Sequence, residues 1–129
     1  MTVTRLGSED TACKPLVVGE ALIHPVEEAT YTFPLSMFTA DEALIERHWS
    51  WLFPRFADAD RNWEMVVQSW IAIVDGAVIV VDPCVGNGRS FPEFPIFDGL
   101  ETPFLERFEA RGLRPEDVHY VFCTHLHSD

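Results

Sequence analysis

Two histidines and an aspartate alternate in the last six residues of the sequence, Thr124 to Asp129. In extended backbone, residues two positions apart point to the same side, so the side chains of His125, His127 and Asp129 would converge. Two imidazoles and a carboxylate at one point suit zinc or iron. The spacing therefore predicts a metal site with these three residues as ligands.

The segment before these residues has the pattern of a strand. Residues 118–123 are mostly apolar, β-branched or aromatic, which predicts a buried strand with the ligands on the loop that leaves it. Asp82 follows a second apolar run, Ala77 to Val81, and a bare carboxylate there would be unfavourable unless it is hydrogen-bonded. We expect Asp82 either to cap that strand or to pin a loop.

A strand followed by Thr-His-x-His-x-Asp resembles the metallo-β-lactamase-fold hydrolases, whose motif reads His-x-His-x-Asp-His. Flanking segments resemble the lactonase and organophosphate-hydrolase branch of this superfamily: Ala77 to Asn87, Thr102 to Leu105 and Gly112 to Val118. The resemblance implies an α/β fold, the four-layer αββα sandwich, with mostly antiparallel or mixed sheets and flanking helices. A full domain of this kind is about twice as long, so we expect a loose leader at residues 1–14 and the N-terminal half of the domain at residues 15–129, ending within the metal motif.

The resemblance also implies a ligand set and a reaction. His125 and His127 would bind one metal with a later histidine, and Asp129 would bind a second, giving two zinc ions per complete domain, with iron or manganese as substitutes. Two cations lower the pKa of a bridging water, and the hydroxide would attack a lactone, an ester or a phosphoester. Asp129 would also act catalytically by orienting water or carrying a proton. Asp82 matches an aspartate below the metal site, and the isolated chain is expected to be inactive.

Two other functions fit the same residues. A mononuclear iron dioxygenase of this fold would use similar ligands. Alternatively, the chain is a non-catalytic half-sandwich or a remnant whose apolar sheet face pairs with a partner, since 47% of its residues are hydrophobic.

Local signals predict the elements that position the site. Asp75-Gly76 between two β-branched runs, residues 65–74 and 77–81, predicts a hairpin whose second arm is buried on both faces. Earlier strands are expected around a turn at Gly19-Glu20, with an edge segment at residues 30–37. Helices are expected after Thr39, in a capping box with Glu42, and after Thr102, as the cap before Pro103.

The other apolar and polar segments give weaker signals. Residues 44–52 repeat apolar side chains at helical spacing, and Leu105, Phe108 and Leu113 would form the buried stripe of the second helix. Residues 58–62 indicate a polar turn. The phenylalanine-rich residues 86–99 either cover their own core or form a wall of a substrate pocket.

Composition limits the classes of binding partner and the cellular compartments that we expect for this protein. Nine basic against 21 acidic residues give a net charge of −12, which disfavours nucleic acid and anionic membranes. Three cysteines without a Cys-x-x-Cys pair favour a reducing compartment, with Cys123 buried as a small apolar side chain. Without a signal peptide or a membrane-length apolar run, we expect a cytoplasmic protein that acts on a small molecule and pairs with a missing C-terminal half or another copy.

Overall fold

The computed structural model describes residues 14–128. The expected leader, apart from residue 14, and the ligand Asp129 therefore lie outside the described residues. The elements in chain order are β1 (Leu16–Val18), β2 (Ala21–Pro34), the 3₁₀ helix η1 (Leu35–Met37), α1 (Glu42–Leu52), β3 (Asn62–Val74), β4 (Ala77–Val81), α2 (Phe104–Glu109), the 3₁₀ helix η2 (Pro115–Asp117) and β5 (Tyr120–Phe122).

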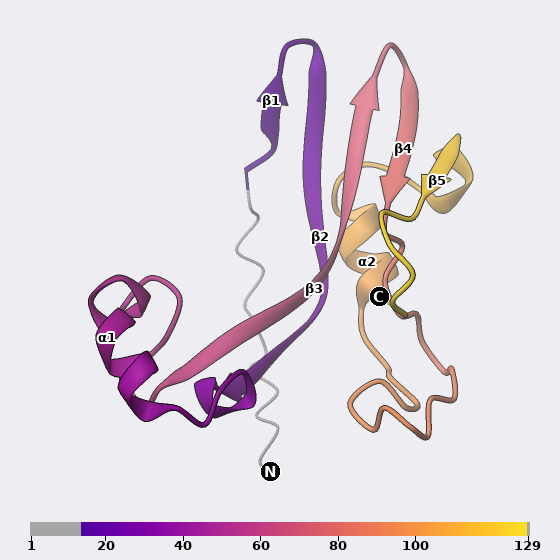
Figure 1. The fold of residues 1–129 in the computed structure, drawn as a ribbon. Coiled ribbons are helices and arrows are strands. Elements are labelled where there is room, and N and C mark those ends of the chain that lie inside the picture. Colours follow the sequence, from indigo (N-terminus) through magenta and orange to yellow (C-terminus); the bar gives the residue numbers. More distant parts are fainter. Residues whose placement is uncertain (1–13, 129) are drawn as a thin grey trace. The chain divides into compact units, whose positions relative to one another are not determined.

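The five strands form one mixed sheet in the order β1-β2-β3-β4-β5 (Figure 1). β1 pairs with β2, and β3 with β4, in antiparallel register. β4 and β5 are parallel, with Ile79 opposite Tyr120 and Val81 opposite Phe122. The predicted mixed sheet is confirmed, and its parallel pair brings the ends of β4 and β5 to the same edge.

The turns follow the local signals. Asp75 and Gly76 both have positive φ, 51° and 77°, as a type I′ turn requires between twisted strands. Gly19, with φ of 60°, makes the turn between β1 and β2. Both predicted turns are confirmed.

Contacts divide the described chain into two compact units, residues 30–66 and residues 14–29 with 67–128. In the second unit, β2, β3, β4 and α2 bury a common core that comprises Val26, Ile71, Val78, Val80 and Phe108. Burial alternates along β4: Val78 and Val80 are buried, whereas Ala77, Ile79 and Val81 are half-buried. The prediction that β4 is buried on both faces was wrong for this chain.

The first unit has its own core, formed by Leu35, Ile45 and Ala57, with Trp49, Leu52 and Trp63 packed around it. Arg61 joins the turn before β3 to α1, because its guanidinium lies 2.7 Å from Glu42 and 2.8 Å from Glu46. These exposed ion pairs orient the turn more than they stabilise the unit.

Both helices begin later than predicted. Asp41 is the N-cap of α1 and accepts a hydrogen bond from the Leu44 amide, whereas Thr39 accepts from the Asp41 amide and lies outside the helix. α2 begins at Phe104 without a side-chain cap, because the amide and hydroxyl of Thr102 both donate to Asn87 Oδ1.

Burial also differs from expectation in α2 and β5. Phe104 packs on the core beside Phe108, whereas Leu105 is 58% exposed. All of β5 is exposed, and Cys123 is exposed rather than buried. β5 lies at the edge of the sheet, where one flank and its side chains meet solvent.

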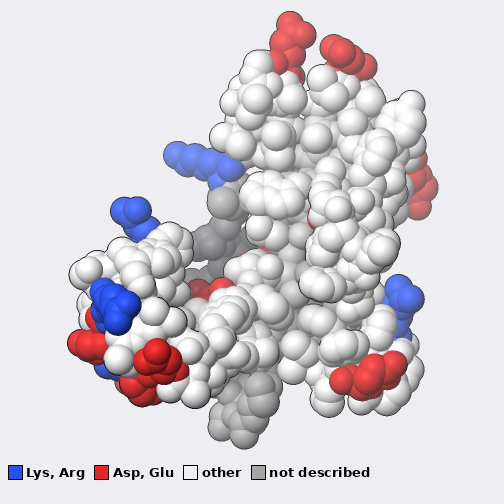
Figure 2. Space-filling model, in the orientation of Figure 1, with Lys and Arg blue, Asp and Glu red and all other residues white. Residues whose placement is uncertain are grey.

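Uncharged side chains cover most of the face of the molecule in Figure 2, with acidic side chains at its margins. Neither α-helix among residues 14–128 has the length and apolarity needed to cross a bilayer.

Residues 58–62 form the predicted polar turn before β3. The Asp58 carboxylate accepts hydrogen bonds from the Asn62 amide at 2.8 Å, the Asn62 side chain at 3.1 Å and the Asp60 amide at 2.9 Å. The donors of Asn62, backbone first and side chain second, hold the pKa of Asp58 below its usual value.

We predict that this turn is stabilised by the ionised form of Asp58. Because the pKa is lowered in the folded state, the contribution is complete above the ordinary aspartate pKa and is lost as pH falls through the folded pKa. Asn62→Ala removes one donor and should raise the Asp58 pKa part of the way, as measured by carboxyl NMR titration. An unchanged titration curve would contradict the side-chain contribution of Asn62.

Candidate metal centre

The candidate site lies beyond the carboxyl ends of β4 and β5. The Asp82 amide donates to the Phe122 carbonyl at 2.8 Å, which continues the contact between the two strands by one residue. The Asp82 carboxylate then accepts from the Thr124 amide at 2.7 Å and from the Thr124 hydroxyl at 2.6 Å. Asp82 therefore binds the first residue of the histidine motif through both of its oxygens.

These two hydrogen bonds favour the ionised form of Asp82. The Thr124 hydroxyl is the larger cause, followed by the Thr124 amide, and together they hold the pKa of the Asp82 carboxyl below its usual value. The carboxylate is thus ionised near neutrality and can only accept hydrogen bonds.

The same contacts assign the protonated nitrogen of His125. The Thr124 hydroxyl has one hydrogen, which it donates to Asp82, so it can only accept from His125 Nδ1 at 3.0 Å. This geometry favours the tautomer that carries the proton on Nδ1. His125 Nδ1 also lies 3.9 Å from Asp82 Oδ1. Metal-binding histidines commonly direct one ring N–H toward a carboxylate network of this kind.

His127 lies beside His125 on the exposed segment after β5. Their ring centroids are 4.9 Å apart and the rings meet edge to face at 79°. The structure thus places His125 beside Asp82 and beside His127, while Asp129 lies outside the described residues. Among residues 14–128 there is no group of three histidine, cysteine, aspartate or glutamate side chains arranged to hold a metal. The donor set fits a metal in its chemistry, two imidazoles beside a carboxylate network, and the assignment of ligands stays a prediction.

A buried carboxylate that the sequence did not point to supports the loop after β4. Glu28 in β2 is 2% exposed, and its two oxygens accept from the amides of Val85 and Gly86, each at 2.8 Å. A weak signal was available, because Glu28 is two positions after the buried Val26 and therefore faces the same side of the strand.

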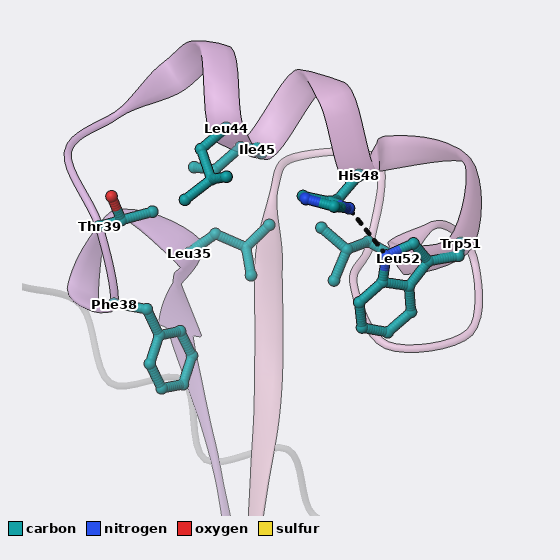
Figure 3. A pocket seen from close by; sticks show the side chains of 8 residues that line it. All are labelled: Leu35, Phe38, Thr39, Leu44, Ile45, His48, Trp51 and Leu52. Atoms are coloured by element: carbon teal, nitrogen blue, oxygen red, sulfur yellow. Dashed lines mark hydrogen bonds between the residues drawn. The ribbon is translucent and has the colours of Figure 1, made fainter.

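An apolar pocket of about 200 Å³ lies in the first unit, around α1 (Figure 3). It is lined by Leu35, Phe38, Thr39, Leu44, Ile45, His48, Trp51 and Leu52. Among these side chains, Trp51 Nε1 donates a hydrogen bond to His48 Nδ1 at 3.4 Å, which Figure 3 marks with a dashed line. None of the described residues predicted to bind metal lines this pocket.

Solved structures share this fold. A probable metal-dependent hydrolase from Staphylococcus aureus is 20% identical, with a TM-score of 0.64, over 88% of this chain and 40% of that one. The hydrolase AbOPH of the beta lactamase superfamily is 18% identical, with a TM-score of 0.61, over 90% of this chain and 36% of that one. AidC, a dizinc quorum-quenching lactonase, is 17% identical, with a TM-score of 0.61, over 90% of this chain and 36% of that one.

These likenesses establish the fold, and this chain spans only about 36–40% of the length of the solved relatives. No curated protein matches the sequence. The family model of the metallo-beta-lactamase superfamily matches residues 62–129, which is more than half of the chain and includes β3, β4, β5 and the histidine motif. The chain belongs to the metallo-beta-lactamase superfamily.

Proposed function

We propose that this chain supplies part of the metal site of a hydrolase that cleaves a lactone, an ester or a phosphoester. His125 and His127 would hold one metal ion, Asp129 would contribute to a second, and the remaining ligands would come from outside residues 1–129. The observation that carries the proposal is the hydrogen-bonded series from Asp82 through Thr124 to His125, because it orients the first histidine of the motif beside a carboxylate.

The residues of this chain have separate tasks in the proposed reaction. Zinc, or iron or manganese in its place, would supply a water of lowered pKa and would polarise the bond to be cleaved. Asp82 and Thr124 would orient the His125 ring. Asp129 would orient the attacking water or carry its proton to the leaving group.

The substrate class is supported by the relatives and by charge. AidC is a dizinc lactonase, and its structure holds a product, N-hexnoyl-L-homoserine. The net charge of −12 disfavours long polyanions such as nucleic acids. A small lactone or ester fits both observations.

A second function is favoured by the exposed apolar edges of the sheet. The side chains of Leu16, Val17 and Val18 in β1 and of Val121 and Phe122 in β5 are 56–66% exposed. An interaction module would use these edges to pair with another chain, whereas the hydrolase would cover them with the rest of its own domain.

We predict that the metal content distinguishes these functions. The protein encoded by the whole reading frame that includes residues 1–129 should contain about two metal ions per chain by elemental analysis. His125→Ala should lose at least one ion and open lactones at least about 100-fold more slowly. His48→Ala, in the pocket of the first unit, serves as the control and should retain both properties.

Absence of zinc, iron and manganese from the purified protein would rule out the hydrolase. One iron per chain with substrate-dependent oxygen uptake would favour the dioxygenase instead. For a polypeptide limited to residues 1–129 we expect no metal-dependent turnover, since two imidazoles and one carboxylate do not complete a binuclear site.

A separate prediction concerns the His125 ring. Thr124→Val keeps the shape of the side chain but removes the hydroxyl that accepts from Nδ1, so the population of the Nδ1-protonated ring should fall. Imidazole ¹⁵N chemical shifts measure this population, and zinc affinity should fall about 10- to 100-fold. Thr39→Val is the matched control. Identical ¹⁵N shifts in Thr124→Val would show that the hydroxyl does not select the tautomer.

A further inference from the structure

Glu28 is a charged side chain in the core of the second unit. It lies in β2, is 2% exposed, and directs both carboxylate oxygens to the backbone of a loop 57 and 58 residues further along the chain. Removing a carboxylate from water is strongly unfavourable unless it is fully hydrogen-bonded. The two amides, each at 2.8 Å, provide these bonds.

The loop bound by Glu28 has an unusual backbone. Asp82, Cys84 and Gly86 have φ values of 53°, 67° and 83°, so left-handed residues alternate through it. Two of the three are not glycine, and such conformations persist only where surrounding contacts determine them. Consecutive amides in a backbone of this kind form a concave anion site, and Glu28 supplies the anion.

β2 is itself held in place at this point. Arg107 of α2 donates to the backbone carbonyls of Glu27 and Glu28 at 3.0 and 3.1 Å. Glu28 lies two residues after Val26, which is a fully buried residue of the core. The strand that carries the Glu28 carboxylate is therefore held in place by the core and by α2. The loop that the carboxylate binds has no regular secondary structure.

The same loop begins at Asp82, which binds Thr124 through both carboxylate oxygens. Only Pro83 and Cys84 separate Asp82 from Val85, so the orientation of the Asp82 carboxylate depends on where the Val85 and Gly86 amides are held. We propose that Glu28 is a positioning residue for the metal site, which acts on His125 through this loop, Asp82 and Thr124. The metal in this inference rests on the proposed function, whereas the hydrogen bonds rest on the geometry of the structure alone.

The test replaces Glu28 by glutamine, which keeps the shape but leaves one acceptor oxygen for two amides. Hydrogen exchange measured by NMR should become at least about tenfold faster at the Thr124 amide as well as at Val85 and Gly86, and the fraction of His125 protonated at Nδ1 should fall. Val80 in the central sheet should keep its wild-type exchange rate. Zinc affinity of the complete protein should fall about 10- to 100-fold. Glu20→Gln, in the exposed turn between β1 and β2, is the charge-matched control.

A second variant perturbs the same loop and keeps the buried charge. Gly86→Ala places a Cβ 3.7 Å from the side chain of Arg89, so there is room for it, but the positive φ of 83° is unfavourable for alanine. It should increase exchange at Thr124 even if Glu28→Gln does not fold.

Wild-type exchange at Thr124 in both variants, with faster exchange only at Val85 and Gly86, would overturn the positioning role. Failure of the wild-type protein to bind metal would overturn the proposed function instead, and the exchange and ¹⁵N measurements would still decide the role of Glu28.

Discussion

The bidentate contact between Asp82 and Thr124 is the interaction on which the arrangement of the histidine motif depends. Residues 121–127 are all exposed, so burial of apolar surface does not order this segment. Residues 121 and 122 are held by pairing with β4, and Thr124 is held by hydrogen bonds to an ionised acceptor at the end of β4, which are stronger than hydrogen bonds between neutral groups. The parallel pairing of β4 with β5 makes the contact possible, because it brings residues 42 positions apart to one edge of the sheet.

Asp82 can make this contact because its backbone is held in a conformation that is rare for aspartate. A non-glycine residue with left-handed φ is disfavoured by about 1–3 kcal/mol, and the loop contains two such residues, Asp82 and Cys84. The compensating contacts come from a different part of the chain, where Glu28 accepts from the amides that follow Cys84. Strain at the site and a buried charge in β2 are thus two parts of one arrangement. Neither is favourable by itself.

Local patterns in the sequence predicted the hairpin at Asp75-Gly76 and the loop position of the two histidines, because each depends on near neighbours, whereas the mixed sheet was predicted from the family resemblance. They failed where a distant residue competes for a local group. Thr102 has the residue type of a helix cap, but its amide and hydroxyl both donate to Asn87, and α2 begins after it. Glu28 was missed for the same reason, since its partners are 57 and 58 residues away. The exposure of β5 could not be predicted from its apolar residues, because exposure depends on what packs beside the edge strand.

Contacts within residues 14–128 orient His125, although the chain spans only about 36–40% of its solved relatives. In the proposed hydrolase, the orientation of the His125 ring and the retention of the metal would therefore depend on different residues. Orientation would depend on Glu28, Asp82 and Thr124. Retention needs further ligands, since two imidazoles alone bind a cation weakly. A ring that is already oriented loses little conformational freedom when the other ligands close around the ion, so more of the binding free energy remains to hold the metal.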